Sequence, residues 1–204
     1  MGDVNQKLYL EKFQPTVDGP ILEVGSKDYA AIDHGATMPF RKVFPHNEYI
    51  GVDLEAGNGV DRTIDLVAGI GDLAENHFAL VICCSVMEHV PRPWKMADNI
   101  TRLVRPGGKL YISVPWVWRY HQYPDDYYRF SFRGIMELYP EFDWSCIHYS
   151  TTVPGEFFVV KESCLGIDNA LAVTHKQGQS RRKYLPYLMV NMLGAKRQLA
   201  QRAA

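Results

Sequence analysis

Three carboxylates stand at or near the ends of apolar segments, where a folded chain could bring them together. Glu23 lies in "PILEV", Asp53 in "EYIGVDL" and Asp65 in "GNGVDRTIDL". A carboxylate can accept hydrogen bonds from a ribose diol or from an exocyclic amine. Gly25 and Ser26 follow the first acid, and a glycine there lets the backbone approach a ligand closely. This pattern indicates a site for a ligand that contains a nucleoside.

The turn after the first acid lacks the glycines of a pyrophosphate-binding loop. Lys27 and Tyr29 follow Gly25 where such a loop would carry further glycines. A dinucleotide-binding turn reads G-x-G-x-x-G and is followed by an acid about 20 residues later. Asp53 lies farther from Gly25 than that. The turn therefore argues against a dinucleotide and fits a ligand without phosphate.

The elements that must position these residues alternate between strand-like and helix-like patterns. Residues 78–86 form a continuous apolar run, as central parallel strands do. Trp94, Ala97, Ile100, Leu103 and Val104 recur at helical spacing. Alternation of this kind predicts an α/β fold with a mostly parallel sheet and helices on both faces. We expect helices at 5–13, 93–104 and 131–139, strands at 20–24, 48–54, 78–86 and 109–116, a short strand within 57–66, and a last antiparallel hairpin from "FDWSCIHYS" and "GEFFVVKES".

The composition fits one globular domain. Apolar residues make up 47% of the 204 residues and charged residues 22%, which excludes a disordered chain. The first residues carry acids and no apolar stretch, so we expect no secretory signal. The four cysteines show no C-x-x-C spacing, which argues against a zinc site. Their pattern fits a protein of the reducing cytoplasm. They are Cys83, Cys84, Cys146 and Cys164.

The end of the chain differs from the rest in charge. Every acid precedes residue 176, and seven basic residues follow: Lys176, Arg181, Arg182, Lys183, Lys196, Arg197 and Arg202. This basic segment faces either an acidic partner, a membrane surface or the acidic body of the chain itself, and we favour the last. We divide the chain into a domain at 1–175 and a helical tail at 176–204. Within the tail, residues 184–195 are apolar nearly all round, and we expect a dimer helix or a lid rather than an interfacial membrane helix.

Several motifs together resemble a known family. They are "ILEVGS", "YIGVDL", "DRTIDL", "ALVICCSVMEHV", "ITRLVRPGGKLYISVP" and "YPDDYYRFS", in this order over about residues 20–135. They are similar to those of class I S-adenosylmethionine-dependent methyltransferases of the type-11 methyltransferase-domain group. The resemblance implies a Rossmann-like sheet of seven strands with an antiparallel C-terminal hairpin. It also implies S-adenosyl-L-methionine as cofactor, and that cofactor carries no phosphate.

The resemblance implies roles for residues at matching positions. Glu23 and Gly25 would flank the methionine part of the cofactor, and Asp53 would bind the ribose hydroxyls. Asp65 and Leu66 would sit at the adenine. The predicted cofactor-binding set is Glu23, Gly25, Ser26, Asp53, Leu54, Asp65, Leu66, Cys84 and Ser85, of which the last two act largely through their backbone. Lys27 and Tyr29 depart from the family pattern, which leaves open how the first loop closes over the cofactor.

Methyl transfer to a hydroxyl requires a base, and histidines near the ends of two strands are the candidates. An imidazole titrates near neutral pH and can take the hydroxyl proton. We assign this role to His121, oriented by Asp125 or Asp126, with His89 as the second candidate. A metal site from Glu88, His89, His121 and Asp126 is an alternative that the spacing does not require. We therefore expect no metal.

Aromatic residues around His121 indicate the kind of acceptor. Trp116, Trp118, Tyr120, Tyr123, Tyr127 and Tyr128 could pack against a flat or sugar-like molecule. The loop also resembles those of methyltransferases found beside sugar and polysaccharide genes. We expect a small-molecule hydroxyl acceptor, such as a sugar or a cell-surface glycan precursor. Two alternatives stay open: a nucleic-acid or other nitrogen acceptor, against which "CSVM" after the fourth strand argues, and an inactive cofactor-binding partner subunit.

Overall fold

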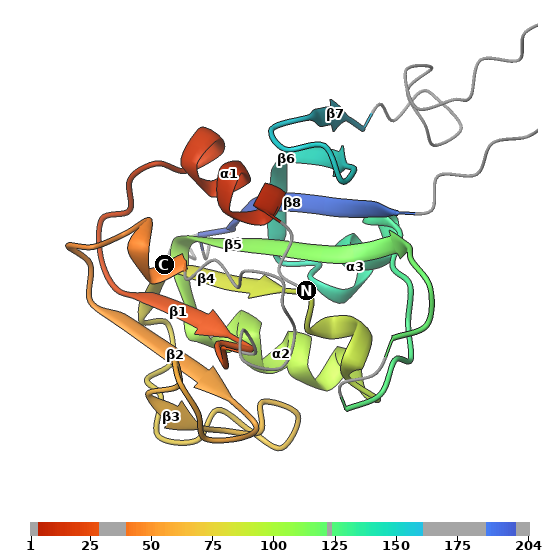
Figure 1. Cartoon of the computed structure of the whole chain (residues 1–204). Helices are drawn as coiled ribbons and strands as arrows, with labels where there is room; N and C mark the ends of the chain where they lie inside the picture. The colour runs from red at the N-terminus through yellow and green to blue at the C-terminus, as the bar shows by residue number, and fades with distance from the viewer. Residues whose placement is uncertain (1–3, 29–39, 122–123, 161–186, 199–204) are drawn as a thin grey trace, which may run out of the picture.

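One twisted sheet connects the described parts of the chain, with the strand order β3-β2-β1-β4-β5-β8-β6-β7 (Figure 1). The computed structural model describes residues 4–28, 40–121, 124–160 and 187–198. Neighbouring strands from β3 to β5 are parallel, whereas β8 is antiparallel to both β5 and β6, and β7 to β6. The strands are β1 (Ile21–Val24), β2 (Tyr49–Asp53), β3 (Arg62–Thr63), β4 (Phe78–Cys84), β5 (Val104–Val117), β6 (Phe142–Ser150), β7 (Phe157–Val159) and β8 (Leu188–Lys196).

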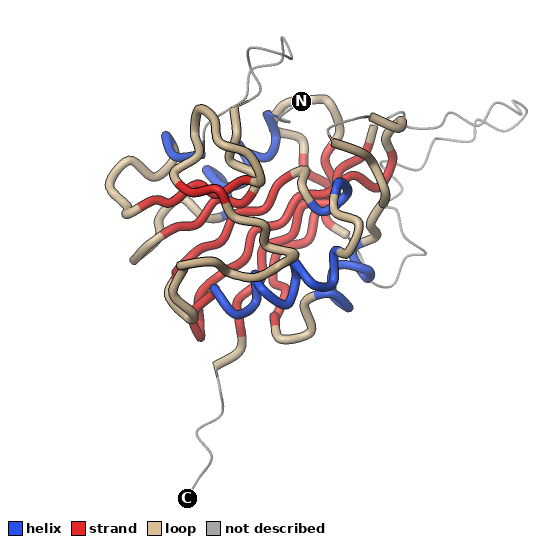
Figure 2. Tube along the Cα trace, turned by 90° about the horizontal axis from the view of Figure 1, so that it is seen from below, coloured by secondary structure: helices blue, strands red, loops and turns tan. Residues whose placement is uncertain are grey.

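Helices cover both faces of the sheet, as Figures 1 and 2 show. Helix α1 (Val4–Phe13) lies on one face, and α2 (Pro93–Leu103) and α3 (Phe132–Leu138) lie on the other. Two short 3₁₀ turns, η1 (Phe40–Lys42) and η2 (Met87–His89), complete the described elements. The predicted α/β fold, mostly parallel with antiparallel C-terminal strands, is confirmed.

Apolar side chains on the two faces of the sheet form two cores. On the α2 side, Val81 and Cys83 of β4 pack with Ile100 and other residues. On the α1 side, Leu80 and Ile82 of the same strand pack with Tyr9. Because β4 is covered on both faces, its sequence is apolar throughout rather than alternating.

Helix α2 follows the predicted apolar spacing with two differences. Met96, Ala97, Ile100 and Leu103 are buried against the sheet, and Pro93 occupies the first turn, where its missing N–H has no cost. Trp94, which we placed on the apolar face, is 49% exposed. Val104 already belongs to β5, because the chain leaves the helix there in an extended conformation.

The prediction that the apolar part of the tail is helical is wrong. Residues Leu188–Lys196 form β8, which lies between β5 and β6 in the interior of the sheet. The sheet therefore has eight strands among the described residues instead of seven, and its domain extends past residue 175. A run that is apolar on every side fits a buried helix and a strand covered on both faces equally well. Asn191 of β8 is fully buried and is satisfied by Tyr111 and Ser150.

Part of the predicted basic segment contacts the body of the protein. The buried Lys196 ammonium donates to the carbonyl oxygens of Thr101 (2.7 Å) and Val104 (3.0 Å) at the end of α2, and to Asn76 Oδ1 (3.1 Å). Arg197 lies 3.3 Å from Asp143. The other basic residues of this segment lie outside the described residues. Within the described part of the chain, none of the helices combines the length and the apolar character needed to cross a bilayer.

The position of β8 predicts that the chain cannot fold without it. Its buried Leu188, Met189, Val190, Met192 and Leu193 each contribute about 1.5–3 kcal/mol, together comparable with the whole stability of a domain. A chain that ends at residue 186 should therefore lose its cooperative thermal transition in circular dichroism. A control chain that ends at residue 198 should keep it. A stable, cooperative shorter chain would show that residues 187–198 are an appendage.

Candidate active site

A cavity opens at the carboxyl ends of β1, β2 and β4. The empty space in it is about 630 Å³, a figure that includes the part open to solvent. Ligands of open α/β sheets bind at this edge. The lining residues are Val24, Gly25, Val52, Asp53, Leu54, Ile64, Leu66, Ser85, Val86, His89, Val90, Met96 and Pro124.

The turn at the end of β1 strongly favours glycine. Gly25 has a φ of 75°, which side chains rarely adopt, and a Cβ there would lie 2.3 Å from Val86 Cγ2. The amides of Gly25 and Ser26 both donate to the carbonyl oxygen of Val52, at 2.9 and 3.1 Å. The chain thus crosses from β1 over the end of β2 and leaves backbone, not side chains, at the cavity wall.

The carboxylate of Asp53 lies at the end of β2, in contact with this turn. It accepts hydrogen bonds from the backbone amides of Lys27 (3.1 Å) and Glu55 (3.3 Å). The Lys27 ammonium extends to the carboxylate of Glu55, at 2.5 Å. The cation that breaks the glycine pattern is therefore paired with an acid outside the cavity lining.

The other two strand acids do not line the cavity. Glu23 accepts a hydrogen bond from the Tyr49 hydroxyl (2.7 Å), and burial raises the pKa of Glu23 to about 7. Asp65 is exposed and accepts from the amide of Val67 (2.8 Å), which stabilises a local turn. Each of these carboxylates has a partner within the fold.

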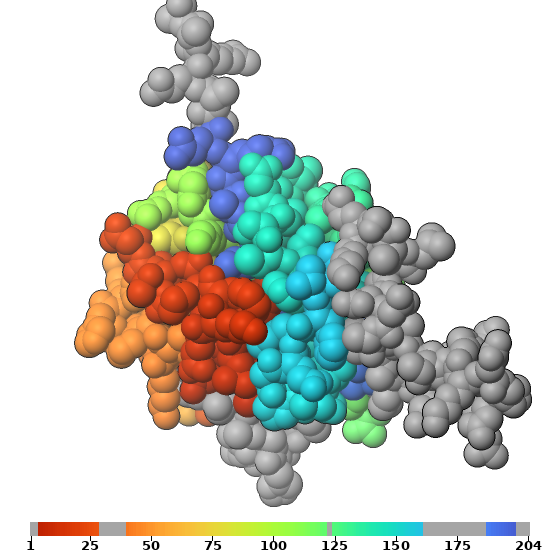
Figure 3. Space-filling view, turned by 90° about the horizontal axis from the view of Figure 1, so that it is seen from above, coloured from red at the N-terminus to blue at the C-terminus, as the bar shows by residue number. Residues whose placement is uncertain are grey.

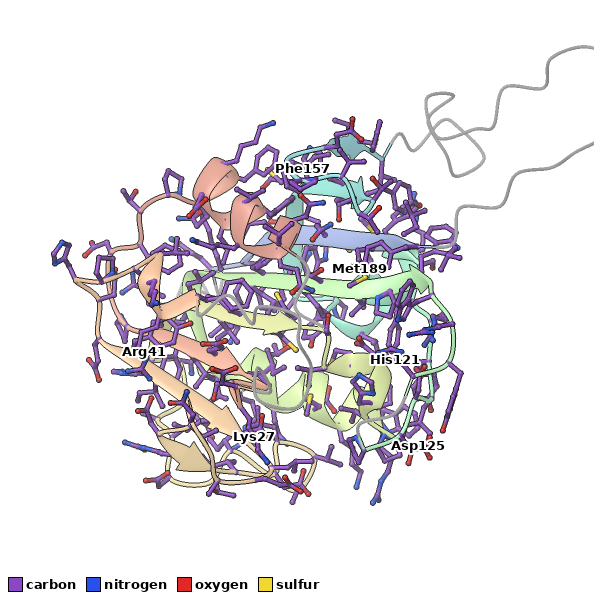
Figure 4. The ribbon with its side chains drawn as sticks, in the orientation of Figure 1. Lys27, Arg41, His121, Asp125, Phe157 and Met189 are labelled. Atoms are coloured by element: carbon purple, nitrogen blue, oxygen red, sulfur yellow. The ribbon has the colours of Figure 1, made fainter. Side chains whose placement is uncertain are left out.

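A charged cluster stands beside the cavity in the segment after β5. The carboxylate of Asp126 is 1% exposed and pairs with the Arg129 guanidinium, one contact being 2.6 Å. That hydrogen bonding lowers the pKa of Asp126 to about 2. Asp126 Oδ2 lies 3.0 Å from Nδ1 of His121 and also accepts from the His121 amide. Figure 4 shows His121 and Asp125 close together and well apart from Lys27.

The η2 turn after β4 contributes Glu88 and His89 to the same cluster. His89 Nδ1 lies 2.6 Å from the carbonyl oxygen of Asp125, which fixes the proton on Nδ1. Its ring meets the ring of His121 edge to face, with centroids 4.8 Å apart. Burial lowers the pKa of His89. The two histidines thus come from different loops and share one wall beside the cavity.

Glu88 is buried and only partly satisfied. Its side chain is 1% exposed, and Oε2 has no hydrogen-bond partner among the described residues. Burial raises the pKa of Glu88 to about 8. Its backbone carbonyl accepts from the amides of Tyr127 (2.8 Å) and Tyr128 (3.3 Å), which holds the loop after β5 against η2. One ligand atom each from Glu88, His89 and His121 lie within 4.8 Å of one another.

Comparisons with known proteins agree with this geometry. Residues 37–112 match the family model of a methyltransferase domain. The chain is 35% identical over 61 residues to a ubiquinone biosynthesis O-methyltransferase of Dechloromonas aromatica, which is 30% of this chain and 26% of that protein. The chain thus covers about a quarter of the length of this curated relative. The resemblance to class I methyltransferases is confirmed.

Solved structures show the same fold over nearly the whole chain. The 1,6-didemethyltoxoflavin-N1-methyltransferase of Burkholderia thailandensis, a complex with S-adenosylhomocysteine, has a TM-score of 0.61 at 13% identity, over 95% of this chain and 77% of that one. The N-methyltransferase NodS of Bradyrhizobium japonicum, also with S-adenosylhomocysteine, has a TM-score of 0.57 at 12% identity, over 95% and 85%. These likenesses establish a methyltransferase fold and identify no acceptor.

The methyltransferase fold brings about half of the predicted cofactor set to the cavity. Gly25, Asp53, Leu54, Leu66 and Ser85 line it, and so does His89 from the catalytic set. Six predicted residues are not among the lining residues: Glu23, Ser26, Asp65, Cys84, His121 and Asp126. His121 and Asp126 are nevertheless paired with each other beside it, as the prediction requires of a base and its orienting acid.

Most of the lining residues that we did not predict are neighbours of those that we did. Val24, Val52 and Val86 adjoin Gly25, Asp53 and Ser85, so adjacency to the motifs would have found them. Met96 comes from the buried face of α2 and carried no signal in the sequence beyond its helical spacing.

The burial of Glu88 predicts a fall in stability with rising pH. Its pKa is about 8 in the folded protein against an ordinary value of 4.5, so the folded state holds an extra proton between these values. Stability should therefore drop from about pH 5 to pH 8. Glu88→Gln cannot ionise and should be more stable than the parent at pH 8 by about 1–3 kcal/mol.

Urea denaturation between pH 5 and pH 9 measures this effect. The control is Glu137→Gln, which changes an exposed carboxylate and should leave the pH dependence unchanged. Parallel stability curves for the parent and Glu88→Gln would show that Glu88 ionises in the folded protein as it does in water.

Proposed function

We propose that this chain binds S-adenosylmethionine in the cavity and transfers its methyl group to a hydroxyl of a small molecule. The observation that carries the proposal is the cavity formed by the Gly25 turn, the Asp53 carboxylate and the end of β4. It lies at the edge of the sheet where this fold binds ligands.

The residues at the cavity fit the chemical groups of the cofactor. Apolar Ile64 and Leu66 can pack against the adenine, and Asp53 can accept from the ribose hydroxyls. The Gly25 turn lets the backbone approach the amino-acid part, and Ser85, directly after β4, also lines the cavity. When bound, S-adenosylmethionine supplies a methyl group on a positively charged sulfur. Glu23, Ser26, Asp65 and Cys84 remain predicted as further cofactor-binding residues, acting outside the described cavity wall.

The His121–Asp126 pair supports the proposal that the methyl group is transferred to a hydroxyl. With the proton on Nδ1 directed to Asp126, the other ring nitrogen of His121 is available to take the hydroxyl proton. Asp126 stays ionised because Arg129 pairs with it, and it stabilises the imidazolium that forms. His89, one ring away, is the second candidate for this base.

The aromatic residues near His121 support a sugar-like acceptor, such as a glycan precursor. Tyr120 is 63% exposed and donates to Asp125, and Tyr127 is 48% exposed. Exposed tyrosines offer a flat apolar face with a polar edge, which suits a polyhydroxylated ring. A screen of small sugars and polyols with methyl-labelled cofactor would identify the acceptor. If the labelled methyl group is found on a nitrogen atom or on nucleic acid, the proposal of a sugar-like hydroxyl acceptor is wrong.

Loss of the Asp53 carboxylate should weaken cofactor binding. Asp53→Ala removes charge-assisted hydrogen bonds worth about 1.5–3 kcal/mol, so the Kd for S-adenosylhomocysteine should rise about 10- to 100-fold. Isothermal titration calorimetry measures the Kd. Asp72→Ala, at an exposed acid outside the cavity, should stay within about twofold of the parent. If Asp53→Ala and the parent bind S-adenosylhomocysteine equally well, Asp53 does not contribute to cofactor binding.

Removal of the proposed base should lower turnover without affecting the cofactor. His121→Ala should reduce kcat about 100- to 10,000-fold on the acceptor found in the screen and leave the Kd of S-adenosylhomocysteine unchanged. His46→Ala, at an exposed histidine far along the chain, is the control. Undiminished turnover in His121→Ala would move the role to His89. We expect no metal, so the parent should keep its activity after dialysis against EDTA.

A further inference from the structure

The side chain of Arg129 joins the two arms of the segment that runs from β5 to α3. Its Nε donates to the carbonyl oxygen of Trp118 (3.1 Å), and its Nη2 donates to that of Arg119 (2.8 Å). Nη1 donates to the carbonyl oxygen of Tyr128 (2.8 Å). Both terminal nitrogens also donate to the Asp126 carboxylate, and Nη2 lies 2.6 Å from Oδ2. All three nitrogens of this guanidinium are therefore bound within one segment.

The segment lies outside helices and strands in both of its described parts, residues 118–121 and 124–131. Its backbone carbonyl groups still need hydrogen-bond donors, and Arg129 supplies them to both arms. Helix α1 lies on the other face of the sheet, where it bonds to the β6–β7 segment, and the red and cyan surfaces of the two touch in Figure 3. Arg129 thus ties this loop together as backbone hydrogen bonds tie strands.

The same guanidinium holds two oxygen atoms that lie near Nδ1 of His121. Asp126 Oδ2 is 3.0 Å from His121 Nδ1, and the carbonyl oxygen of Arg119 is 3.3 Å from it. Each of these oxygens accepts a hydrogen bond from Nη2 of Arg129, at 2.6 Å and 2.8 Å respectively. The position of this one nitrogen therefore determines where both acceptors for the Nδ1 proton lie.

The acceptors near Nδ1 matter for the chemistry of the ring. The nitrogen of a neutral imidazole that carries the proton is set by its hydrogen bonds, and a base needs the other nitrogen without a proton. The side chain of Asp126 is 1% exposed, so water is poorly placed to replace a lost contact with Arg129. A residue that holds these acceptors can act on His121 without touching the acceptor molecule.

We propose that Arg129 is a positioning residue for the proposed base, because it fixes Asp126 and the Arg119 carbonyl so that neutral His121 keeps its proton on Nδ1. The inference rests on the proposed function. The role requires the planar fork of arginine as well as its charge. A lysine ammonium can pair with Asp126, but its single nitrogen cannot reproduce the contacts that three nitrogens make with both arms of the segment.

The tautomer of His121 tests the inference without any acceptor molecule. NMR of ¹⁵N-labelled imidazoles distinguishes the two neutral forms at about pH 8.5, above the ordinary titration range of histidine. In the parent, the His121 signal, assigned by its absence in His121→Ala, should show the proton on Nδ1. In Arg129→Lys, the form with the proton on the other nitrogen, which a free histidine side chain prefers, should predominate. Arg102→Lys, at an arginine paired with Glu75 on α2, should keep the parent spectrum.

Turnover on the acceptor found in the screen tests whether the effect reaches catalysis through His121. Arg129→Lys should lower kcat about 10- to 100-fold, because a misplaced base reacts more slowly. The Kd of S-adenosylhomocysteine should stay within about twofold of the parent. In a His121→Ala background, Arg129→Lys should lower kcat by less than about twofold, since the group that it positions is already gone.

The outcomes separate this inference from the proposed function. An unchanged His121 tautomer in folded Arg129→Lys, or an equal loss of kcat with and without His121, would overturn the role of Arg129 and leave cofactor binding intact. A folded parent that binds no S-adenosylhomocysteine would overturn the proposed function, and with it the base that Arg129 would position. If Arg129→Lys does not fold, Arg129→Gln carries the same test, because it removes the fork and keeps an N–H donor for the loop.

Discussion

The arrangement of the site depends on the backbone turn at Gly25. The turn has room for a hydrogen atom and no more, because Val86 fills the space where a side chain would start. With glycine there, the chain leaves β1 across the end of β2 and stays bonded to Val52. The ends of β1, β2 and β4 then enclose a cavity instead of a packed contact. A side chain at Gly25 would meet the Val86 side chain and strain the backbone at its positive φ, so it would distort the turn.

The two faces of the sheet have different roles around this turn. The α2 face provides apolar cavity walls, including Met96 and Leu66. The α1 face carries buried polar groups, among them Gln6, Ser113 and Asn191, which bond to one another or to their strand neighbours. Such groups are costly unless satisfied, and once satisfied they fix a single arrangement. The hydrogen bonds of these groups therefore add to apolar packing in fixing the middle of β5 against its neighbours.

The fold was predictable from the sequence wherever a pattern had a single structural solution. The strand with Asp53 and the helix at 93–103 follow directly from their apolar spacing. The pairing of His121 with Asp126 could be predicted because the two residues are close in sequence. The strand Leu188–Lys196 could not be predicted from the sequence. A run that is buried on all sides has no periodicity that distinguishes a helix from a strand. Gln6 and Ser85 are far apart in the chain, and only the packing of α1 brings them together.

The central claim is that the cavity at the Gly25 turn binds S-adenosylmethionine, and calorimetric titration of the folded chain with that cofactor tests it most directly. The account predicts saturable binding with one site per chain, and competition by S-adenosylhomocysteine at the same site. A folded chain that gives no binding signal with either compound would contradict the account.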